Sequence, residues 1–234
     1  MLIAALRWGG WECGLWVERM RARRAVDARW IGWAALAATL GGVLWVPYGV
    51  FEMMQPWGDD TVYRDERGYE VVTDTLLYHL YSLPGSVALL LTSLGLLGVF
   101  ERLGLPAGRT GRTGLVLAYA ALVLALLSAA GVVVRFDPLF TAPRIFGTLA
   151  LAAATLLAGI EARRTDAVAG WWRAALLALG LLGLFLLPLW PLVHAVEIAP
   201  EEVGAGVIAL FGLGWVLVGY RLWLSQAEQV ASNR

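Results

Sequence analysis

Histidine is rare in this chain, and one of its two histidines lies close to a carboxylate. His194 and Glu197 are three residues apart in the stretch LPLWPLVHAVEIAPEEVG, a spacing that places both side chains on one face of a helix. Neutral imidazole and carboxylate together can bind zinc, iron or copper, and two histidines can bind a haem iron axially. The candidates for a metal or haem site are therefore His79, His194 and Glu197.

Other polar residues belong at the same depth as this pair if the apolar stretches around them are helices. His79 begins one apolar stretch shortly after Asp74, and Glu52 ends the stretch before it. The full candidate pocket comprises Tyr48, Glu52, Asp74, Tyr78, His79, Tyr81, His194 and Glu197. Three interpretations stay open: a metal-free polar pocket, a metal or haem site, and polar decoration of a membrane interface with no site. We predict no bound cofactor, with metal or haem as the alternative.

Several kinds of chemistry are excluded by residues that the chain lacks. It has no lysine, so it cannot form the Schiff base of retinal or pyridoxal phosphate. Its one cysteine, Cys13, permits neither an intrachain disulfide nor a thiolate metal cluster. The segment GRTGRTG lacks the lysine of a phosphate-binding P-loop. The formal net charge of zero disfavours a nucleic-acid partner.

The composition indicates an integral membrane protein. Hydrophobic residues make up 59% of the 234 residues and charged residues only 15%, whereas a soluble domain has about 25% charged residues. The charges are clustered, so long stretches carry none. About 20 apolar residues form a helix that crosses a membrane. We predict an all-α, six-helix transmembrane bundle from residues 30–224, with spans at Trp30–Phe51, Thr75–Phe100, Thr113–Val134, Ile145–Ile160, Ala174–Val196 and Val203–Tyr220. The fourth and sixth of these are short for a span.

The distribution of arginine predicts the orientation of the bundle. With both termini in the cytoplasm, fourteen arginines lie inside and four lie outside, namely Arg64, Arg67, Arg135 and Arg144. Cytoplasmic loops carry the excess of positive charge in membrane proteins. We therefore expect a multi-pass protein of the plasma or inner membrane.

The segments outside the bundle are short. Residues 1–29 contain Trp8, Trp11 and Leu15 on one helical face, followed by RMRARR, which predicts an amphipathic helix held at the interface by anionic lipids. A seventh span within residues 1–17 is the alternative. Residues 225–234 form a short cytoplasmic tail.

The first outer loop differs from the other connections. Thr61–Arg64 and Tyr69–Val72 are β-prone and flank the turn DERG, which predicts a small external hairpin, and Thr73 or Asp74 is expected to cap the next helix. Eight of the nine prolines fall in the outer halves or outer loops. Proline disrupts helical hydrogen bonding, so we expect a splayed outer half in which a cavity can open.

The interior of the predicted bundle offers little chemistry. No charged residue or histidine lies near a helix centre, which argues against a proton pump or an ion channel. The leading hypothesis is a non-enzymatic membrane subunit or binding protein with an outward pocket for a lipid, an apolar ligand or a membrane-protein partner. The alternatives are a transporter of a neutral or hydrophobic solute and a membrane redox or metal enzyme subunit that uses His79, His194 and Glu197.

Overall fold

The described part of the chain is helical apart from one two-stranded hairpin. The computed structural model describes residues 29–51, 61–64, 69–72, 74–105, 108–165, 171–186 and 201–232. The helices are Arg29–Phe51, α2 (Thr75–Arg102), α3 (Arg109–Val134), α4 (Asp137–Arg164), α5 (Trp171–Leu181) with the π-helix η3 (Leu182–Leu186), and α7 (Glu201–Ser232). The strands are β1 (Thr61–Arg64) and β2 (Tyr69–Val72).

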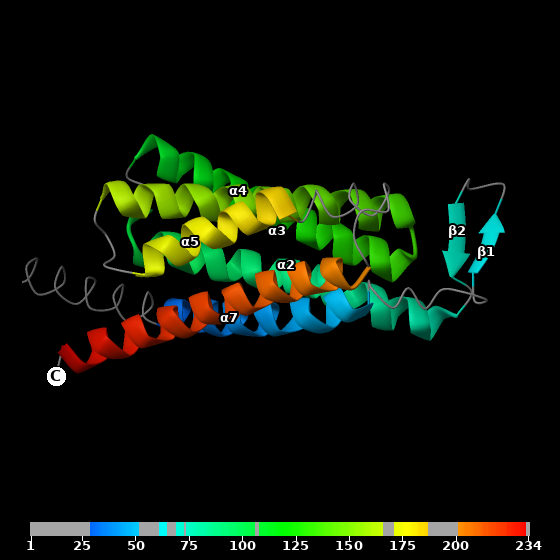
Figure 1. Cartoon of the computed structure of the whole chain (residues 1–234), viewed down its shortest axis with the longest axis horizontal. Helices are drawn as coiled ribbons and strands as arrows, with labels where there is room; N and C mark the ends of the chain where they lie inside the picture. Colours follow the sequence, from blue (N-terminus) through cyan, green and yellow to red (C-terminus); the bar gives the residue numbers. More distant parts are fainter. Residues whose placement is uncertain are drawn as a thin grey trace, which may run out of the picture.

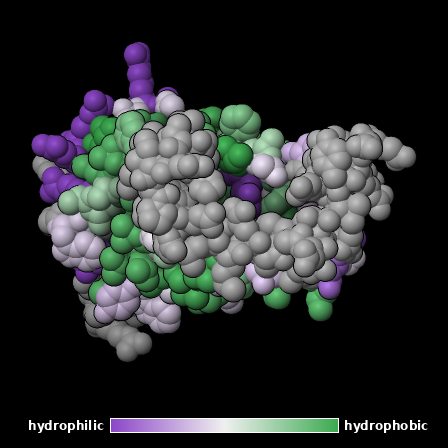
Figure 2. All heavy atoms as spheres, turned by 45° about the vertical axis from the view of Figure 1, so that its right-hand side comes forward, coloured by the Kyte–Doolittle hydropathy of each residue, from purple (hydrophilic) through white to green (hydrophobic). Residues whose placement is uncertain are grey.

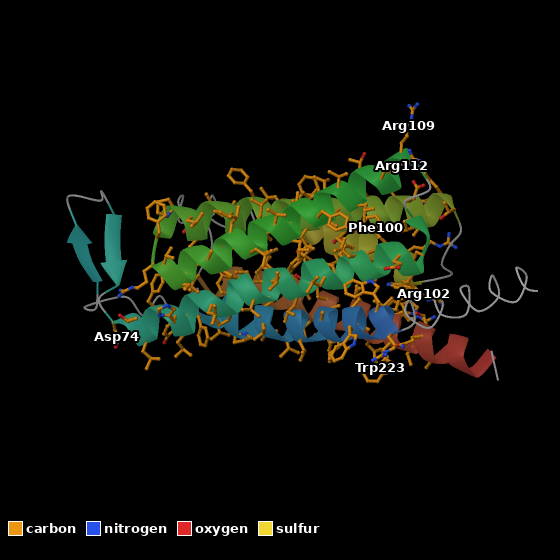
Figure 3. The ribbon with its side chains drawn as sticks, turned by 180° about the vertical axis from the view of Figure 1, so that it is seen from behind. Asp74, Phe100, Arg102, Arg109, Arg112 and Trp223 are labelled. Atoms are coloured by element: carbon orange, nitrogen blue, oxygen red, sulfur yellow. The ribbon has the colours of Figure 1, made fainter. Side chains whose placement is uncertain are left out.

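The helices run up and down alongside one another, and this arrangement gives the molecule two unlike ends (Figure 1). The hairpin end has β1, β2, the start of α2 and the turn between α3 and α4. The arginine end has the start of the Arg29–Phe51 helix, the turn between α2 and α3, and the C-terminal part of α7. Figure 3 shows Arg102, Arg109, Arg112 and Trp223 at the arginine end and Asp74 at the hairpin end.

Five helices are long enough and apolar enough to cross a membrane, as predicted for most of the spans. They are Arg29–Phe51, Tyr78–Arg102, Arg109–Val134, Pro138–Arg164 and Gly206–Ala227. The fourth span is longer than the sixteen apolar residues suggested, because α4 begins at Asp137 with Pro138 in its first turn and includes Pro143. Proline is well tolerated in a first helical turn because its missing N–H has no helical partner there. The apolar helix Trp171–Phe185 is shorter than the others.

The surface and the core have the polarity expected of a protein in lipid. Large apolar side chains are exposed along the middle of the helices, for example Val123, Leu126 and Leu217, while Ser86, Ser128 and Thr155 are buried. Among the coloured residues in Figure 2, apolar ones predominate, and hydrophilic residues are densest toward the arginine end. A water-soluble bundle would place its polar residues outside.

The Arg29–Phe51 helix is held between α2 and α7 by small residues. A Cβ added to Gly42 would lie 2.6 Å from the carbonyl oxygen of Gly212 and 2.6 Å from the backbone nitrogen of Val216. A Cβ added to Gly95 would lie 2.5 Å from the Cβ of Ala38. Backbones that approach this closely gain van der Waals contacts, which are a main source of stability between helices in lipid.

The hairpin has the predicted strands. β1 and β2 pair in antiparallel register, with Thr61 opposite Val72 and Arg64 opposite Tyr69. Residues 1–28, where we predicted the interfacial helix or a seventh span, lie outside the described residues, as does the second half of the predicted fifth span.

Candidate functional site

Five of the eight predicted pocket residues lie in the described part of the chain, and all five are at the hairpin end. Tyr48 lies near the end of the first described helix, whereas Asp74, Tyr78, His79 and Tyr81 lie in or just before the first turns of α2. The other three predicted residues, Glu52, His194 and Glu197, lie outside the described residues.

The first turn of α2 is fixed by local hydrogen bonds. Asp74 caps the helix as predicted, because its carboxylate accepts a hydrogen bond from the Leu76 backbone N–H at 2.8 Å. The Nδ1 atom of His79 lies 2.6 Å from the carbonyl oxygen of Thr75. A carbonyl oxygen can only accept, so Nδ1 carries the proton, and Nε2 is the ring nitrogen that could bind a metal.

Arg135 links the turn after α3 to the start of α2. Its backbone is left-handed, with φ 53° and ψ 46°, and Phe136 donates from its N–H to the carbonyl oxygen of Gly131 at 3.0 Å, as in a Schellman motif. Its guanidinium donates to the Thr75 hydroxyl at 2.7 Å. The same guanidinium lies over the Tyr78 ring, 5.5 Å from the ring centroid. Within 6 Å a cation is attracted to the ring face.

Arg144 lies against two further aromatic rings. Its guanidinium carbon is 4.3 Å from the centroid of Phe140 and 5.1 Å from the centroid of Tyr48. Tyr48 and Phe140 are both buried, and Phe140 also packs edge-on against Tyr78 at 6.5 Å. Arg144 was expected in an outer loop, but it lies two turns inside α4 because the helix begins at Asp137.

The ring contacts continue from Tyr48 into the core. Trp45 lies edge-on to Tyr48 and to Phe211, at 5.6 Å between centroids in both cases, and Phe211 lies 6.4 Å from Trp215. We name this connected set the arginine–aromatic chain: Arg135, Tyr78, Phe140, Arg144, Tyr48, Trp45, Phe211 and Trp215. It connects the turn after α3 with α2, α4, the Arg29–Phe51 helix and α7.

Two buried serines form a hydrogen-bonded link next to Phe140 of the arginine–aromatic chain. The hydroxyl of Ser128 donates to the carbonyl oxygen of Phe140 at 3.0 Å and lies 2.8 Å from the hydroxyl of Ser86. Both serines are buried, and they connect α2, α3 and α4 at the level of Phe140. The link therefore fixes α4 where it carries Phe140 and Arg144.

The arginine end has a polar cluster of a different kind. Glu161 is buried, and its carboxylate lies against Gly108 at the beginning of α3, where a Cβ on Gly108 would overlap it. Arg164 donates to the hydroxyl of Thr110 at 2.8 Å. The helix start in GRTGRTG thus already has a carboxylate beside it, which is the arrangement that the helix dipole favours. This cluster fastens the turn between α2 and α3 to the end of α4.

Within the described residues, no three His, Cys, Asp or Glu side chains come together as a metal site would require. Of the three metal candidates only His79 is described, so a metal site that includes His194 and Glu197 stays an untested alternative to the prediction of no cofactor.

Six residues of the arginine–aromatic chain were not among the predicted pocket residues: Trp45, Arg135, Phe140, Arg144, Phe211 and Trp215. The segment RFDPLFTAPR contained a signal, because Phe140 and Arg144 are four residues apart and would share a helix face. Its two prolines and two arginines suggested a loop instead.

Comparison of the chain with models of known protein families, with curated proteins and with solved structures gives no match in any of the three. The function is therefore inferred from the sequence and the contacts of the described residues alone.

Proposed function

We propose that the protein is a multi-pass protein of the plasma or inner membrane with its arginine end in the cytoplasm. Five helices have the length and hydropathy of membrane spans. At the arginine end Trp33, Trp171 and Trp223 are each more than half exposed. Exposed tryptophans next to arginines are typical of helix ends at a membrane interface.

We further propose that the protein is a non-enzymatic membrane subunit or binding protein that takes a lipid or another apolar ligand at the hairpin end. The observation that carries this proposal is Arg144, which is half-buried and stacked on Phe140 and Tyr48 two turns inside an apolar helix. Ionisable residues inside membrane-spanning helices are rare, and they often mark a functional site. The exposed apolar residues that follow Arg144, Ile145 and Phe146, offer an apolar surface to the rest of the ligand.

Lipid retention tests this proposal. The protein is extracted gently from its native membrane, and bound lipids are measured by native mass spectrometry for the wild type and for Arg144→Gln. We expect the variant to lose at least half of the retained lipid or apolar ligand while eluting as a folded protein. The matched control is Arg163→Gln, which changes an exposed arginine at the opposite end.

Two further variants cover predicted pocket residues that are outside the described part. Glu52→Ala and His194→Ala should also change ligand retention or the capture of a membrane partner. Unchanged retention in Arg144→Gln, Glu52→Ala and His194→Ala together would rule out a pocket at this end.

A transporter of a neutral or hydrophobic solute is the second candidate, and η3 favours it. The π-helix Leu182–Leu186 directly follows α5 in the apolar part of the bundle. Such segments often occur at functional sites in helices, because they break the regular hydrogen-bond pattern. Liposomes that contain the protein should then show solute flux that empty liposomes lack.

A further inference from the structure

Two tryptophans in the arginine–aromatic chain have a buried hydrogen-bond donor without a partner. Trp45 is 2% exposed and Trp215 is 0% exposed. Neither indole N–H has a hydrogen-bond partner, whereas the buried hydroxyls of Ser86, Thr92 and Ser128 all have one among the described residues. An unpaired buried donor is costly and calls for an explanation.

Both indoles contact the ring of Phe211. Phe211 is in edge contact with Trp45 at 5.6 Å and with Trp215 at 6.4 Å. We call Trp45, Phe211 and Trp215 the inner part of the arginine–aromatic chain, and none of these three residues is charged. Transfer of an anion into such surroundings would cost far more than transfer of a neutral group. The chemistry that fits two N–H donors among aromatic rings is a neutral acceptor on an apolar molecule.

The position of Trp215 along its span limits which molecules can bring an acceptor to its indole. Trp215 lies close to the middle of the apolar stretch Gly206–Ala227 in α7. If this stretch crosses the membrane, the indole is about 15 Å from either boundary of a hydrocarbon core that is about 30 Å thick. The ester carbonyls of phospholipids lie near those boundaries, so they do not reach this depth. A carbonyl carried by a ring that dissolves in the hydrocarbon can reach it.

The π-helix η3 packs against Phe211, one of these rings. A Cβ added to Gly183 would lie 2.9 Å from a ring carbon of Phe211 and 2.6 Å from the Cβ of Ala152. Protein atoms cover the indole nitrogens in this conformation, so a ligand can reach them only if a neighbouring segment moves. We take η3 as the candidate segment, because π-helical turns are often found at functional sites.

We infer that the inner part of the arginine–aromatic chain binds a neutral, carbonyl-bearing apolar ring molecule of the quinone class, whose carbonyl oxygens accept hydrogen bonds from the indoles of Trp45 and Trp215. This inference rests on the proposed binding function, names the class of its ligand and places the ring of that ligand further inside the bundle than Arg144. It concerns binding alone and involves no electron transfer.

The test uses the full chain in nanodiscs made of ether-linked phosphatidylcholine, which has no ester carbonyl. Binding of radiolabelled decylubiquinone is measured by equilibrium dialysis against empty nanodiscs of the same lipid. We expect saturable excess binding of about one molecule per chain. Decylbenzene, which has a similar tail and no carbonyl group, should show no saturable excess.

Three tryptophan variants identify the donors. Trp45→Phe and Trp215→Phe keep a ring but remove the N–H, and each should weaken decylubiquinone binding about tenfold, the effect of losing one hydrogen bond. Trp172→Phe is the control: Trp172 is also buried with an unpartnered indole, but it lies in the first turn of α5 at the arginine end. Its binding should be unchanged.

Several results would overturn the inference. These are the absence of saturable decylubiquinone binding, equal binding of decylbenzene, or an equal loss in Trp172→Phe. The decylbenzene comparison uses the wild type, so it decides the matter even if a tryptophan variant does not fold. If quinone binding fails while lipid retention still depends on Arg144, only the ligand class is wrong. If both fail, the proposed binding function is wrong as well.

Discussion

At the scale of single residues, Arg135 combines an unfavourable backbone with favourable side-chain contacts. It is the one described residue other than glycine with a positive φ, and a left-handed backbone costs an ordinary residue roughly 1–2 kcal/mol. Its side chain offsets this cost through Thr75 and Tyr78. Backbone strain of this kind is found where a side chain is required in one place.

Two substitutions separate these effects. Both Arg135→Ala and Arg135→Gly remove the side-chain contacts, but only glycine adopts the left-handed backbone without strain. We expect the free energy of unfolding to be about 1 kcal/mol higher for Arg135→Gly than for Arg135→Ala. Denaturant unfolding in detergent micelles measures the difference. Equal stabilities would show that the turn changes its conformation in the variants.

The buried serine pair allows a second prediction at this scale. Ser128→Ala removes the donor to the Phe140 carbonyl and the partner of Ser86. We expect a loss of about 0.6–1.7 kcal/mol in the free energy of unfolding, which spans the average and the maximum found for polar contacts between membrane helices. The double variant with Ser86→Ala should cost less than the sum of the single changes, because both serines belong to one link. Strict additivity in the double-mutant cycle would contradict the link.

Residue-scale prediction from sequence succeeded where the signal was local and failed where it depended on neighbouring helices. Thr73 or Asp74 was expected as the cap from residue type and position before α2, and Asp74 is the one that accepts the capping hydrogen bond. Tyr48, Tyr78 and Tyr81 were expected at one level, and they do lie at the hairpin end. The contact of Arg144 with Tyr48 depends on how two helices distant in sequence pack, and no periodicity in either helix specifies that.

At the scale of elements, close approach of backbones holds the Arg29–Phe51 helix against α7. Gly42→Ala places a methyl group 2.6 Å from two backbone atoms of α7, neither of which can move without shifting that helix. We expect a loss of about 1–3 kcal/mol, the usual cost of overpacking. The control is Gly206→Ala, because a Cβ at Gly206 meets nothing within 4 Å. Thermal unfolding in micelles should show a lower Tm for Gly42→Ala alone; similar Tm values would contradict this packing.

Most elements were predictable because charge-free runs and β-prone flanks are local patterns. The hairpin strands were placed at Thr61–Arg64 and Tyr69–Val72, and both are confirmed. The start of α4 was placed too late, since its prolines and arginine resemble a loop when packing is unknown. The helix continues through them because Pro138 occupies the first turn and Arg144 has aromatic neighbours. The π-helix η3 has no sequence signal that we recognised.

At the scale of the whole molecule, the two ends differ in a way that bears on orientation. The arginine end carries arginines from six of the described helices, together with three exposed tryptophans. At the hairpin end, Arg135 and Arg144 are half-buried and lie over aromatic rings. Among the arginines whose side chains the structure describes, the exposed ones all lie at the arginine end, and such an excess is typical of a cytoplasmic end.

Cysteine labelling tests this orientation. Cys13 is the single native cysteine, so Cys13→Ser gives a background without thiols. Leu76→Cys then places a thiol at an exposed position of the hairpin end, and Thr165→Cys places one at an exposed position of the arginine end. In intact cells a membrane-impermeant maleimide should label Leu76→Cys and leave Thr165→Cys unlabelled until the cells are permeabilised. Labelling of Thr165→Cys in intact cells, with Leu76→Cys protected, would reverse the orientation and place the arginine–aromatic chain toward the cytoplasmic leaflet. Labelling of both in intact cells would show that the bundle does not separate two compartments.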